Sequence, residues 1–448
     1  MAHAERPGAR LHAVERLAAW AVRSRSAPLA PEVLHHAKRA AIDWHAALYP
    51  GAVVPPATYL EVALQDELNH GKAKLAMGKP ATVRAAALIN GTAAHTMEVD
   101  DIFRDGIYHP GAPTISAVLA VAQSLNLSGM DFLRAVVVGY EISTRIGAAM
   151  GRAHYRYWHN TGTIGCFGAC AAVSEAMQLN ERQFAHALAT VTTFSAGLQQ
   201  AFRMDSMSKP LHAGRAAEAG VTAALAAREG VTGSLDVMQG FGSAMGDNPN
   251  WDEAFATLGK DFHITRMTFK NHACCGHTFA AIDGALALKA RLKIAAGDIE
   301  RVRVGTYRAG IEVAHYEAPR TPAEARFSLK YVVATALTHG SVRLAAFDAA
   351  RIDDPATKHL MSKISVAVDP ELDATFPRQR AARVAIEARG GKREELLQPT
   401  RKGDPDLPLT DRELEEKYLE LVTPVLGAGK AKDLLQRLWR LESLPALP

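Results

Sequence analysis

A change in hydrophobic period along the chain is the feature that most constrains its fold. Up to about residue 265, apolar residues recur with the 3.6-residue spacing of amphipathic helices. Beyond residue 266 the spacing becomes two, because residues 299–304, 364–368 and 381–388 alternate as half-buried strands do. A capping box at Thr410-Asp411-Arg412-Glu413 then restarts a helical pattern. The chain is therefore expected to form a helical region, a mixed region with strands, and a helical tail.

Start and stop signals divide the helical region into separate helices. Ser128-Gly129-Met130-Asp131 has the form of a capping box and predicts a helix that ends at Gly151. Asn180 caps a helix that should run toward Leu198. A further helix is expected over residues 213–227.

Glycines mark two breaks in these patterns. Four glycines and Pro249 between residues 231 and 250 predict a loop or linker. Gly390-Gly391 follows the last alternating segment and predicts a hairpin turn before a partner strand.

Length and composition narrow the class of protein. A chain of 448 residues, 48% of them apolar, can form two domains with sizeable cores. Its net charge of +4 is spread among interleaved charges, without the Lys/Arg stripe and aromatics of a nucleic-acid groove. No run approaches the roughly 20 uncharged residues of a membrane span, and the N-terminal residues have no signal-like apolar stretch. The sequence predicts a cytoplasmic protein that binds neither nucleic acid nor membrane.

Four cysteines in a chain of this length do not form a disulfide framework. Cys166 and Cys170 lie one helical turn apart among small residues, which is typical of buried thiols. Cys274 and Cys275 are adjacent, and neither pair shows the repeated spacing of a structural zinc site. No glycine-rich nucleotide motif occurs either, so we expect no metal and no organic cofactor.

Titratable residues gather in three separate clusters within apolar, glycine-broken stretches. The clusters are His95 to His109, Lys209 to His212, and Lys270 to His277. Lysine neutralises anionic oxygens, and histidine transfers protons near neutral pH. If the fold brings the clusters together, they would suit a small substrate that carries several carboxylates.

The first cluster combines His95 with acids that include Asp100 and Asp101. Acids at this density seldom lie on a buried face unless they are paired or protonated, so a solvated helix end is the alternative. His109 precedes the apolar helix expected over residues 114–125, and a helix N-terminus favours a bound anion. A functional and a structural role are equally open for this segment.

The other two clusters have structural alternatives of their own. Lys209 precedes a proline, which predicts an extended segment just before a helix, but a lone lysine is usually exposed. His159 enters a helix of small residues, which could serve either close packing or carboxylate binding. Lys270 to His277 falls at the predicted junction of two domains, where ligand sites are favoured. A Cys/His metal site is the rival interpretation there, and it lacks the usual ligand spacing.

Six motifs in a fixed order make the chain resemble the MmgE/PrpD family. This family includes 2-methylcitrate dehydratases, itaconate-forming cis-aconitate decarboxylases and iminodisuccinate epimerases. The resemblance covers nearly the whole chain. The motifs are Asn90-Gly91 through His109-Pro110, Gly139-Tyr140-Glu141, His159 through Gly168, Lys209-Pro210-Leu211-His212-Ala213-Gly214, Lys270 through Asp283, and Phe327-Ser328-Leu329-Lys330-Tyr331.

The resemblance implies a mainly α fold with a smaller α+β domain. A large all-helical domain would comprise residues 1–265 and 401–448, with an α/β lid inserted at 266–400. It also implies a homodimer, the absence of metal and organic cofactor, and a pocket between the domains. The residues expected to be catalytic are Lys209, His109, His159, Lys270, Asp100 and Asp101. Those expected to contact substrate are Glu98, His212, Cys275 and His277.

The common chemistry of this family is proton movement at a carbon next to a carboxylate, which needs a base and fixed positive charge together. Lys209 and Lys270 are expected to clamp carboxylates of a small di- or tricarboxylate, while His109 or His159 moves the proton. Loss of hydroxyl would then give dehydration, and loss of carboxylate would give decarboxylation. Return of the proton to the opposite face would give epimerisation.

Three residues depart from the itaconate-forming branch of the family. Where that branch carries an acid, a threonine and a second-domain histidine, this chain has Glu98, Ile102 and Cys275. The loop from Asp101 to His109 is also one residue longer. These changes count against cis-aconitate decarboxylation. The motifs Lys209-Pro210-Leu211-His212-Ala213-Gly214 and Cys274-Cys275-Gly276-His277 resemble epimerase-like and uncharacterised bacterial members more than dehydratases proper. We expect a lyase (dehydratase) or an epimerase, with an iminodisuccinate-type epimerase as the specific alternative. A cis-aconitate decarboxylase and a non-catalytic polycarboxylate-binding homologue stay as alternatives.

Overall fold

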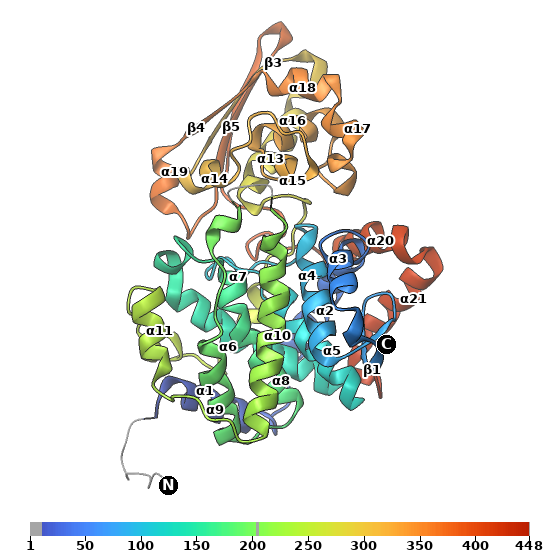
Figure 1. The fold of residues 1–448 in the computed structure, drawn as a ribbon. Helices are drawn as coiled ribbons and strands as arrows, with labels where there is room; N and C mark the ends of the chain where they lie inside the picture. The colour runs from blue at the N-terminus through green and yellow to red at the C-terminus, as the bar shows by residue number, and fades with distance from the viewer. Residues whose placement is uncertain (1–10, 203–205, 448) are drawn as a thin grey trace.

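The computed structural model describes residues 11–202 and 206–447, which form two parts stacked one above the other (Figure 1). The lower, larger part is helical, and the upper part contains a four-stranded sheet with helices beside it. Helix makes up 61% of the structure, and the two sheets have only two and four strands. The predicted fold class, mainly α with a smaller α/β part, is confirmed.

Twelve helices of the lower part precede the crossing to the upper part. They are α1 (Ala13–Ser24), α2 (Pro31–Ala52), α3 (Ala57–Ala63), α4 (Val83–Thr96), α5 (Gly111–Leu125), α6 (Gly129–Tyr155), α7 (Asn160–Thr163), α8 (Gly165–Ala176), α9 (Glu181–Thr192), α10 (Ser208–Arg228), α11 (Val237–Met245) and α12 (Trp251–Ala254). Short 3₁₀ turns η1 (Gln65–Glu67), η2 (Gln199–Phe202) and η3 (His263–Arg266) and a small hairpin of β1 (Leu68–Lys74) and β2 (Pro80–Ala81) complete it.

The middle of the helical part is buried on all sides. Every residue of α8 is buried, and so is α5 from Gly111 to Ala122. A helix that is apolar around its whole circumference must be enclosed by other helices. α5 and α8 are therefore central, and α4, α6 and α10 pack around them.

Glycine allows α4 and α10 to cross at very short range. A Cβ on Gly91 would lie 2.9 Å from the Cα of Gly214, and a Cβ on Gly214 would lie 2.2 Å from the carbonyl oxygen of Leu88. No larger side chain fits this crossing without moving a backbone. The crossing brings the C-terminal end of α4 beside the first turn of α10, which contains Lys209.

The upper part is built on one mixed sheet with strand order β4-β3-β5-β6. Its strands are β3 (Ile299–Thr306), β4 (Ile364–Val368), β5 (Ala382–Ala388) and β6 (Lys392–Gln398). β3 pairs parallel to β4 and antiparallel to β5, in a register that places Val304 opposite Val384. β5 and β6 form a hairpin through Gly390 and Gly391, both with positive φ, so the predicted turn is confirmed.

Helices of the upper part cover the sheet and enclose a separate hydrophobic cluster. α13 and α16 pack against the strands, and the buried side chains between them include Val302, Val304, Val384 and Ile386. The helices are α13 (Phe279–Leu292), α14 (Arg308–Val313), α15 (Pro322–Arg326), α16 (Leu329–His339), α17 (Ala349–Ile352), α18 (Pro355–Met361) and α19 (Pro370–Thr375), with short turns η4 (Gly276–Thr278), η5 (Ala296–Asp298), η6 (Leu344–Phe347) and η7 (Arg389–Gly391).

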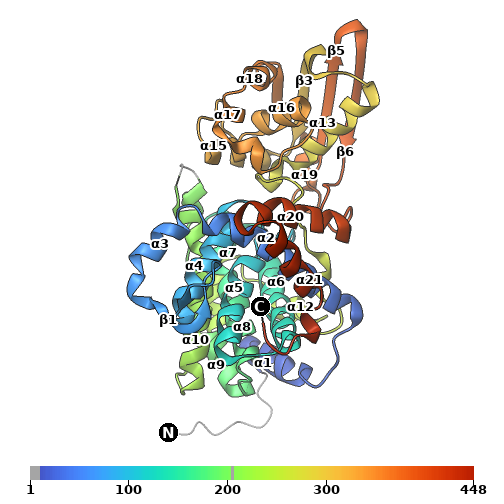
Figure 2. The same ribbon diagram turned by 90° about the vertical axis from the view of Figure 1, so that its right-hand side faces the viewer.

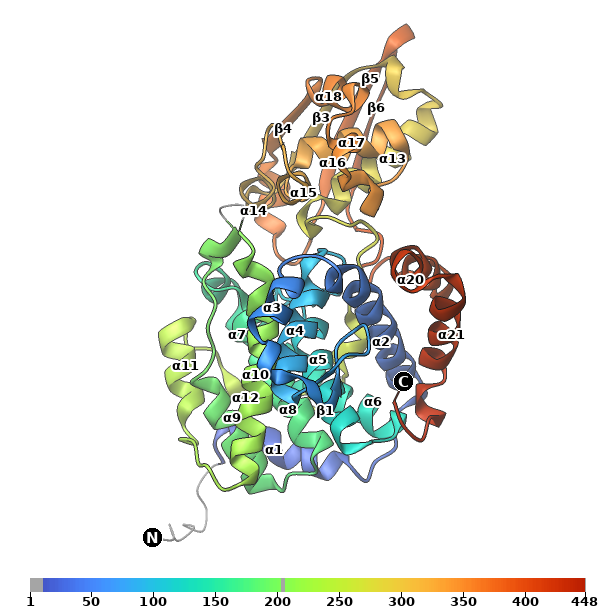
Figure 3. The ribbon, with the colours of Figure 1, turned by 45° about the vertical axis from the view of Figure 1, so that its right-hand side comes forward.

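The chain then returns to the helical part. α20 (Asp411–Leu426), α21 (Ala428–Trp439) and η8 (Leu441–Ser443) follow, and α20 and α21 lie beside α2 (Figure 3). In the orthogonal view, α20 is at the level where the two parts meet (Figure 2). The buried Lys417 ammonium of α20 donates to Asp43 of α2 at 2.5 Å and to the Val99 carbonyl at 2.6 Å. The predicted domain boundaries at residues 265 and 400 stay predictions, since packing alone does not fix where a domain ends.

Several local predictions need correction. α6 continues to Tyr155 through a non-helical Gly151, and α9 ends at Thr192. The predicted loop between residues 231 and 250 contains α11, whose apolar residues pack on α6 and α9.

The start of α10 is the correction that matters for the site. This helix begins at Ser208, so Lys209 lies in its first turn and not in an extended segment. Pro210 does not prevent this, because the first backbone N–H groups of a helix have no intrahelical partner anyway. Among the described residues, no helix is both long and apolar enough to cross a membrane.

Candidate active site

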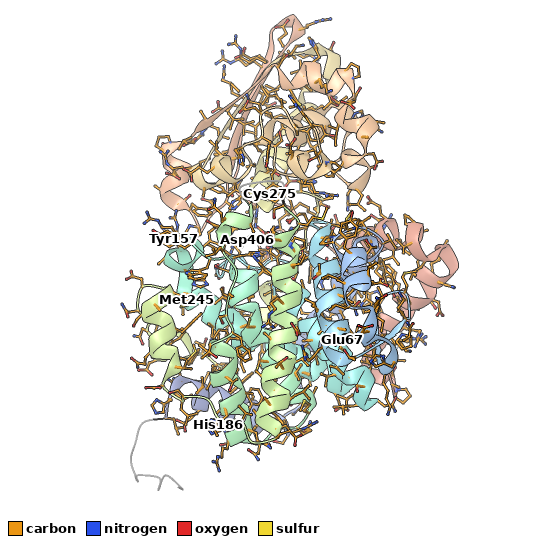
Figure 4. All side chains as sticks on the ribbon, viewed as in Figure 1. Glu67, Tyr157, His186, Met245, Cys275 and Asp406 are labelled. Carbon is orange, nitrogen blue, oxygen red and sulfur yellow. The ribbon has the colours of Figure 1, made fainter. Side chains whose placement is uncertain are left out.

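A small pocket of about 60 Å³ lies where the two parts meet. Cys275, at the junction in Figure 4, belongs to its wall. Seven of the ten predicted site residues line this pocket: Glu98, His109, His159, Lys209, Lys270, Cys275 and His277. Of the other three, Asp100 and His212 contact the wall residues His109 and His159 from behind, whereas Asp101 contacts Gly111 at the start of α5.

Two sides of the pocket come from different parts of the molecule. We call Glu98, His109, His159, Thr161, Lys209 and Lys270 the helical wall, because all are held by the ends of α4, α5, α7 and α10 or bonded to them. We call Cys275, His277 and Arg380 the α/β wall, because they border η4 and β5 of the upper part.

Glu98 bridges the two lysines of the helical wall. α4 ends at Thr96, and Glu98 adopts a left-handed φ of 58°, which turns its carboxylate away from the helix axis. Lys209 Nζ donates to one carboxylate oxygen, while Lys270 Nζ lies 3.3 Å from the other and 2.9 Å from the Glu98 carbonyl oxygen. The structure thus joins residues from all three sequence clusters in one ion-pair network.

Backbone pairing places Lys270 opposite Glu98. Ile102 and Thr268 exchange two backbone hydrogen bonds of 2.9 Å, which align the segment before Lys270 with the loop after α4. Burial lowers the pKa of Lys270, and burial and the Lys270 ammonium lower the pKa of Lys209. For Lys270 the Asp100 carboxylate opposes the effect of burial, because a nearby negative charge favours the ammonium form.

A buried carboxylate, Asp100, holds two imidazoles. Its Oδ2 lies 2.7 Å from His95 Nδ1 and 3.2 Å from His109 Nδ1. Burial alone would raise the pKa of Asp100, but His109 and His95 hold it well below its ordinary value. Burial lowers the pKa of His95 to about 3, so this ring is neutral and donates its Nδ1 proton to the carboxylate.

His159 continues this imidazole cluster into the pocket. Its ring stacks on His95 with centroids 5.4 Å apart, and its Nδ1 lies 3.0 Å from Nδ1 of His212. Burial and the neighbouring His95 keep the pKa of His159 well below its ordinary value, and burial lowers the pKa of His212. Two neutral imidazoles can share this contact with one as donor and the other as acceptor.

Asp101 lies behind the helical wall and fixes the start of α5. Its Oδ1 accepts the Gly111 N–H at 3.0 Å, and its Oδ2 accepts the Tyr140 hydroxyl at 2.8 Å. Burial, reinforced by the Asp43 carboxylate, raises the pKa of Asp101 to about 7. Of the two adjacent acids, Asp100 therefore contacts the pocket histidine and Asp101 positions the helix that follows it.

The α/β wall contains groups of different kinds. Burial raises the pKa of the Cys275 thiol, although Lys270, Lys209 and Arg380 oppose this. His277 Nδ1 lies 2.8 Å from the Tyr307 hydroxyl, and burial and the Arg380 charge keep the pKa of His277 well below its ordinary value. Both side chains are therefore neutral near pH 7.

Three polar residues of the pocket wall were not predicted from the sequence: Arg380, Tyr155 and Thr161. Arg380 directly precedes a predicted strand within a polar stretch, and Tyr155 ends a long helix. Thr161 belongs to the quoted His159–Gly168 motif, and its hydroxyl accepts the His109 N–H at 3.2 Å. No local pattern in the sequence sets Arg380 or Tyr155 apart.

One group of residues has the composition of a metal site. The ligand atoms of His95, Asp100 and His109 lie within 4.8 Å of one another. Two ligands of a tetrahedral zinc, each about 2.05 Å from the ion, lie roughly 3.3 Å apart. The 2.7 Å contact between His95 and Asp100 is shorter and matches a charge-assisted hydrogen bond. We therefore interpret the group as a carboxylate that is hydrogen-bonded to His95, with the His109 ring beside it.

A second, larger cavity adjoins the pocket. It measures about 580 Å³ and shares Glu98, Lys209 and Phe327 with the pocket wall. Its other walls come from both parts and include Met97, Phe347 and Arg326. The pocket thus shares part of its wall, including Lys209, with a space large enough for a small organic acid.

Comparison with family models and curated proteins agrees with this architecture. The model described as MmgE/PrpD N-terminal domain matches residues 15–254, and the MmgE/PrpD C-terminal domain matches residues 272–441. The chain is 27% identical to the cis-aconitate decarboxylase-like protein oryM of Aspergillus oryzae, over 95% of this chain and 93% of that protein. It is 26% identical to the cis-aconitate decarboxylase of Homo sapiens over 80% of this chain and 76% of that protein. For the cis-aconitate decarboxylase of Aspergillus terreus the values are 24%, 93% and 90%.

Proposed function

Because the chain belongs to the MmgE/PrpD family, we propose that it is a lyase that removes a proton next to a carboxylate of a small di- or tricarboxylate. The observation that carries this proposal is the pocket itself, where a carboxylate-backed histidine and two lysines face the same space. In the proposed reaction this chain's own side chains supply the base and the positive charge. As the family resemblance implies, we further propose a homodimer that uses neither metal nor organic cofactor.

His109 is the proposed base. It lines the pocket, and its Nδ1 faces the ionised Asp100 at 3.2 Å, which leaves Nε2 for proton transfer. When the ring takes a proton from the substrate carbon, the Asp100 carboxylate stabilises the imidazolium that forms. The Thr161 hydroxyl accepts the backbone N–H of His109 and so fixes the backbone position from which this ring projects. A positioned base of this kind contributes about 10²- to 10⁴-fold to a rate.

Lys209 and Lys270 would stabilise the charge that develops on the substrate carboxylate. Each ammonium has three N–H donors, and the Glu98 carboxylate accepts from both lysines. Glu98 thereby keeps the two charges fixed and close together before substrate binds. Preorganised positive charge in a buried site stabilises an aci-carboxylate more than water does, because it need not reorganise during the reaction.

His159 is the proposed second proton-transfer group. It is neutral, lines the pocket and is held by His95 on one side and His212 on the other. A neutral imidazole can deliver the Nε2 or Nδ1 proton to a leaving hydroxyl or to a carbanion. Dehydration needs such an acid, whereas decarboxylation needs it only to protonate the carbon that remains.

The choice among reactions rests on different observations. The names of the relatives favour decarboxylation of cis-aconitate. Glu98, Ile102 and Cys275 depart from that branch, and Ile102 places an apolar side chain in the pocket wall. We therefore propose dehydration of a hydroxy-polycarboxylate first and decarboxylation second.

Epimerisation is a further candidate because Cys275 lies on the wall opposite the histidines. A protonated thiol there could return a proton to the other face of the carbon. Cys275→Ser distinguishes the reactions, because a lyase should lose less than about tenfold in kcat while a two-sided epimerase should lose far more. A loss above 10³-fold with unchanged folding would move the assignment to an epimerase.

The test is proton NMR of the purified protein in D₂O with citrate, 2-methylcitrate, cis-aconitate and iminodisuccinate. New vinyl signals that conserve all carboxylates would identify dehydration, and vinyl signals with release of CO₂ would identify decarboxylation. Deuterium next to a carboxylate without a new product would identify epimerase chemistry. Saturable binding of these acids without any proton exchange would overturn the proposal and identify a non-catalytic binder.

A further inference from the structure

Arg380 differs from the other cations of the pocket wall in having no carboxylate partner among residues 11–202 and 206–447. It lies two residues before β5 and is only 4% exposed. One terminal nitrogen donates to the Arg104 carbonyl at 3.1 Å, and its guanidinium lies 5.7 Å from the centre of the Phe376 ring. Its Nε is buried and makes no hydrogen bond to the described residues.

The neighbouring cations show what a buried charge in this protein normally has. Glu98 pairs with both Lys209 and Lys270. Arg401, also buried and close to Arg380, is held by both carboxylate oxygens of Asp404, at 2.7 and 2.6 Å. Buried charges are usually paired in this way, because an unpaired one is costly to remove from water. Arg380 lacks such a pair among the described residues, as does Arg326 of the adjoining cavity, and Arg380 lines the pocket itself.

Burial and the Arg401 charge lower the pKa of Arg380. Both effects measure how poorly this position supports an isolated positive charge, and both would be relieved by a bound anion. An arginine is also better suited than a lysine to a planar anion, since its fork donates two parallel hydrogen bonds to a carboxylate.

Charge effects on Cys275 indicate how the cations surround the pocket. The thiol responds to Lys270, Lys209 and Arg380 together, so Cys275 lies within electrostatic reach of all three. The lysine pair belongs to the helical wall and Arg380 to the α/β wall. A molecule that spans the pocket would therefore meet positive charge at both ends.

We propose that Arg380 forms a second anion subsite, which binds a carboxylate of the substrate that is not the one at Lys209 and Lys270. This inference deepens the proposed function and rests on it for the identity of the first carboxylate. The substrate class is then an acid with at least two separated carboxylates, and monocarboxylic acids are excluded. Arg380 recognises the substrate, and the proton-transfer groups of the helical wall act on it.

Three probe acids separate the two subsites by calorimetry on the full chain. Tricarballylate has three carboxylates, glutarate has the two terminal ones, and butyrate has one. The protein should bind tricarballylate and glutarate more tightly than butyrate. Arg380→Met should weaken the first two by roughly 30-fold or more, because a buried charge-assisted pair is lost. It should change butyrate binding by less than about threefold.

Matched variants guard against a purely structural effect. Arg383→Met removes the same side chain three residues along, where it pairs with Asp369 on the sheet outside the pocket, and should leave all three affinities unchanged. Arg380→Lys keeps the charge without the fork and should recover part of the loss. If Arg380→Met does not fold, the subsite is tested instead by Arg380→Lys and by the preference of the unmodified protein for glutarate over butyrate.

Equal weakening of all three acids, or no weakening, would overturn the subsite. So would an unmodified protein that does not prefer glutarate over butyrate. Since binding is measured without turnover, the outcome is independent of the proposed reaction. Absence of proton exchange with every substrate would refute the lyase while an Arg380-dependent preference for two carboxylates still stood.

Discussion

The helical wall and the α/β wall of the pocket are organised in different ways. On the helical wall the charged groups bond to one another, since Asp100 holds His95 and His109, and Glu98 holds both lysines. On the α/β wall, Arg380 faces the pocket without a carboxylate partner among the described residues. The difference indicates that the two walls have different roles. We propose that the helical wall carries out proton transfer and that the α/β wall binds an anion of the substrate.

Among the substitutions that test the difference between the two walls, Asp100→Asn should have the largest effect. The substitution keeps the shape of the side chain but removes the charge that supports His109, so kcat should fall roughly 10³-fold with little change in KM. Steady-state kinetics of the variant beside Asp105→Asn, an exposed carboxylate of the same loop, would measure it. An Asp100→Asn enzyme within tenfold of the parent would remove Asp100 from the mechanism.

Lys209→Met tests the charge on the helical wall. Methionine has a similar length, but it leaves Glu98 with Lys270 alone and removes one stabiliser of the developing anion. We expect kcat/KM to fall about 10²- to 10³-fold. The exposed Lys358→Met is the control and should be silent. Full turnover by a folded Lys209→Met protein would exclude the proposed role of this lysine.

Gly214→Ala sharpens the comparison by loosening the frame of the helical wall. The added Cβ would lie 2.2 Å from the Leu88 carbonyl and from Thr92 Oγ1, so α4 and α10 must separate. Denaturant unfolding should show a loss of about 3 kcal/mol. Gly429→Ala in α21 meets no atom within 4 Å and should cost nothing. Equal stabilities of the two variants would contradict the close crossing.

Asp101→Asn should have an effect that is confined to part of the pH range. The pKa of Asp101 is raised to about 7 in the folded protein from an ordinary value of 3.8, so folding favours its protonated form. That stabilisation is fully present below about pH 4 and is lost as the pH rises through 7.

The asparagine variant carries no such proton. The free energy of unfolding of the variant, relative to that of the parent, should therefore rise by about 3–4 kcal/mol between pH 4 and pH 7, since each unit of raised pKa corresponds to about 1.4 kcal/mol. Denaturant curves at several pH values check this, with Asp105→Asn as reference. A difference that does not vary with pH would refute the raised pKa.

Elements with a strong local signal could be predicted from the sequence. The strands β3, β4 and β5 lie where residues alternate, and the capping boxes at Ser128, Asn180 and Thr410 start helices as expected. Helix ends were less predictable. α10 starts ahead of the expected residue 213 because a proline in a first turn breaks no hydrogen bond, and α11 forms within a glycine-rich stretch because its apolar side chains pack on neighbours.

The residues of the site were likewise predictable from the sequence only in part. Histidines and lysines in apolar, glycine-broken segments are visible in a sequence, because such residues are costly to bury without a purpose. Asp100 and Asp101 could not be told apart, since their different partners come from residues 109 and 140. Arg380 could not be found at all. Its significance depends on the absence of a partner in three dimensions, which no local pattern records.

Hydrogen–deuterium exchange at the carbon next to a carboxylate of a bound acid tests the central claim most directly. Exchange is measured by NMR in D₂O at saturating acid for the parent, His109→Asn and Arg380→Met, with His359→Asn as an exposed control. We expect His109→Asn to bind the acid but to exchange at least about 100-fold more slowly. Arg380→Met should bind weakly and still exchange when saturated. Exchange at the parent rate by His109→Asn would contradict the assignment of proton transfer to the helical wall.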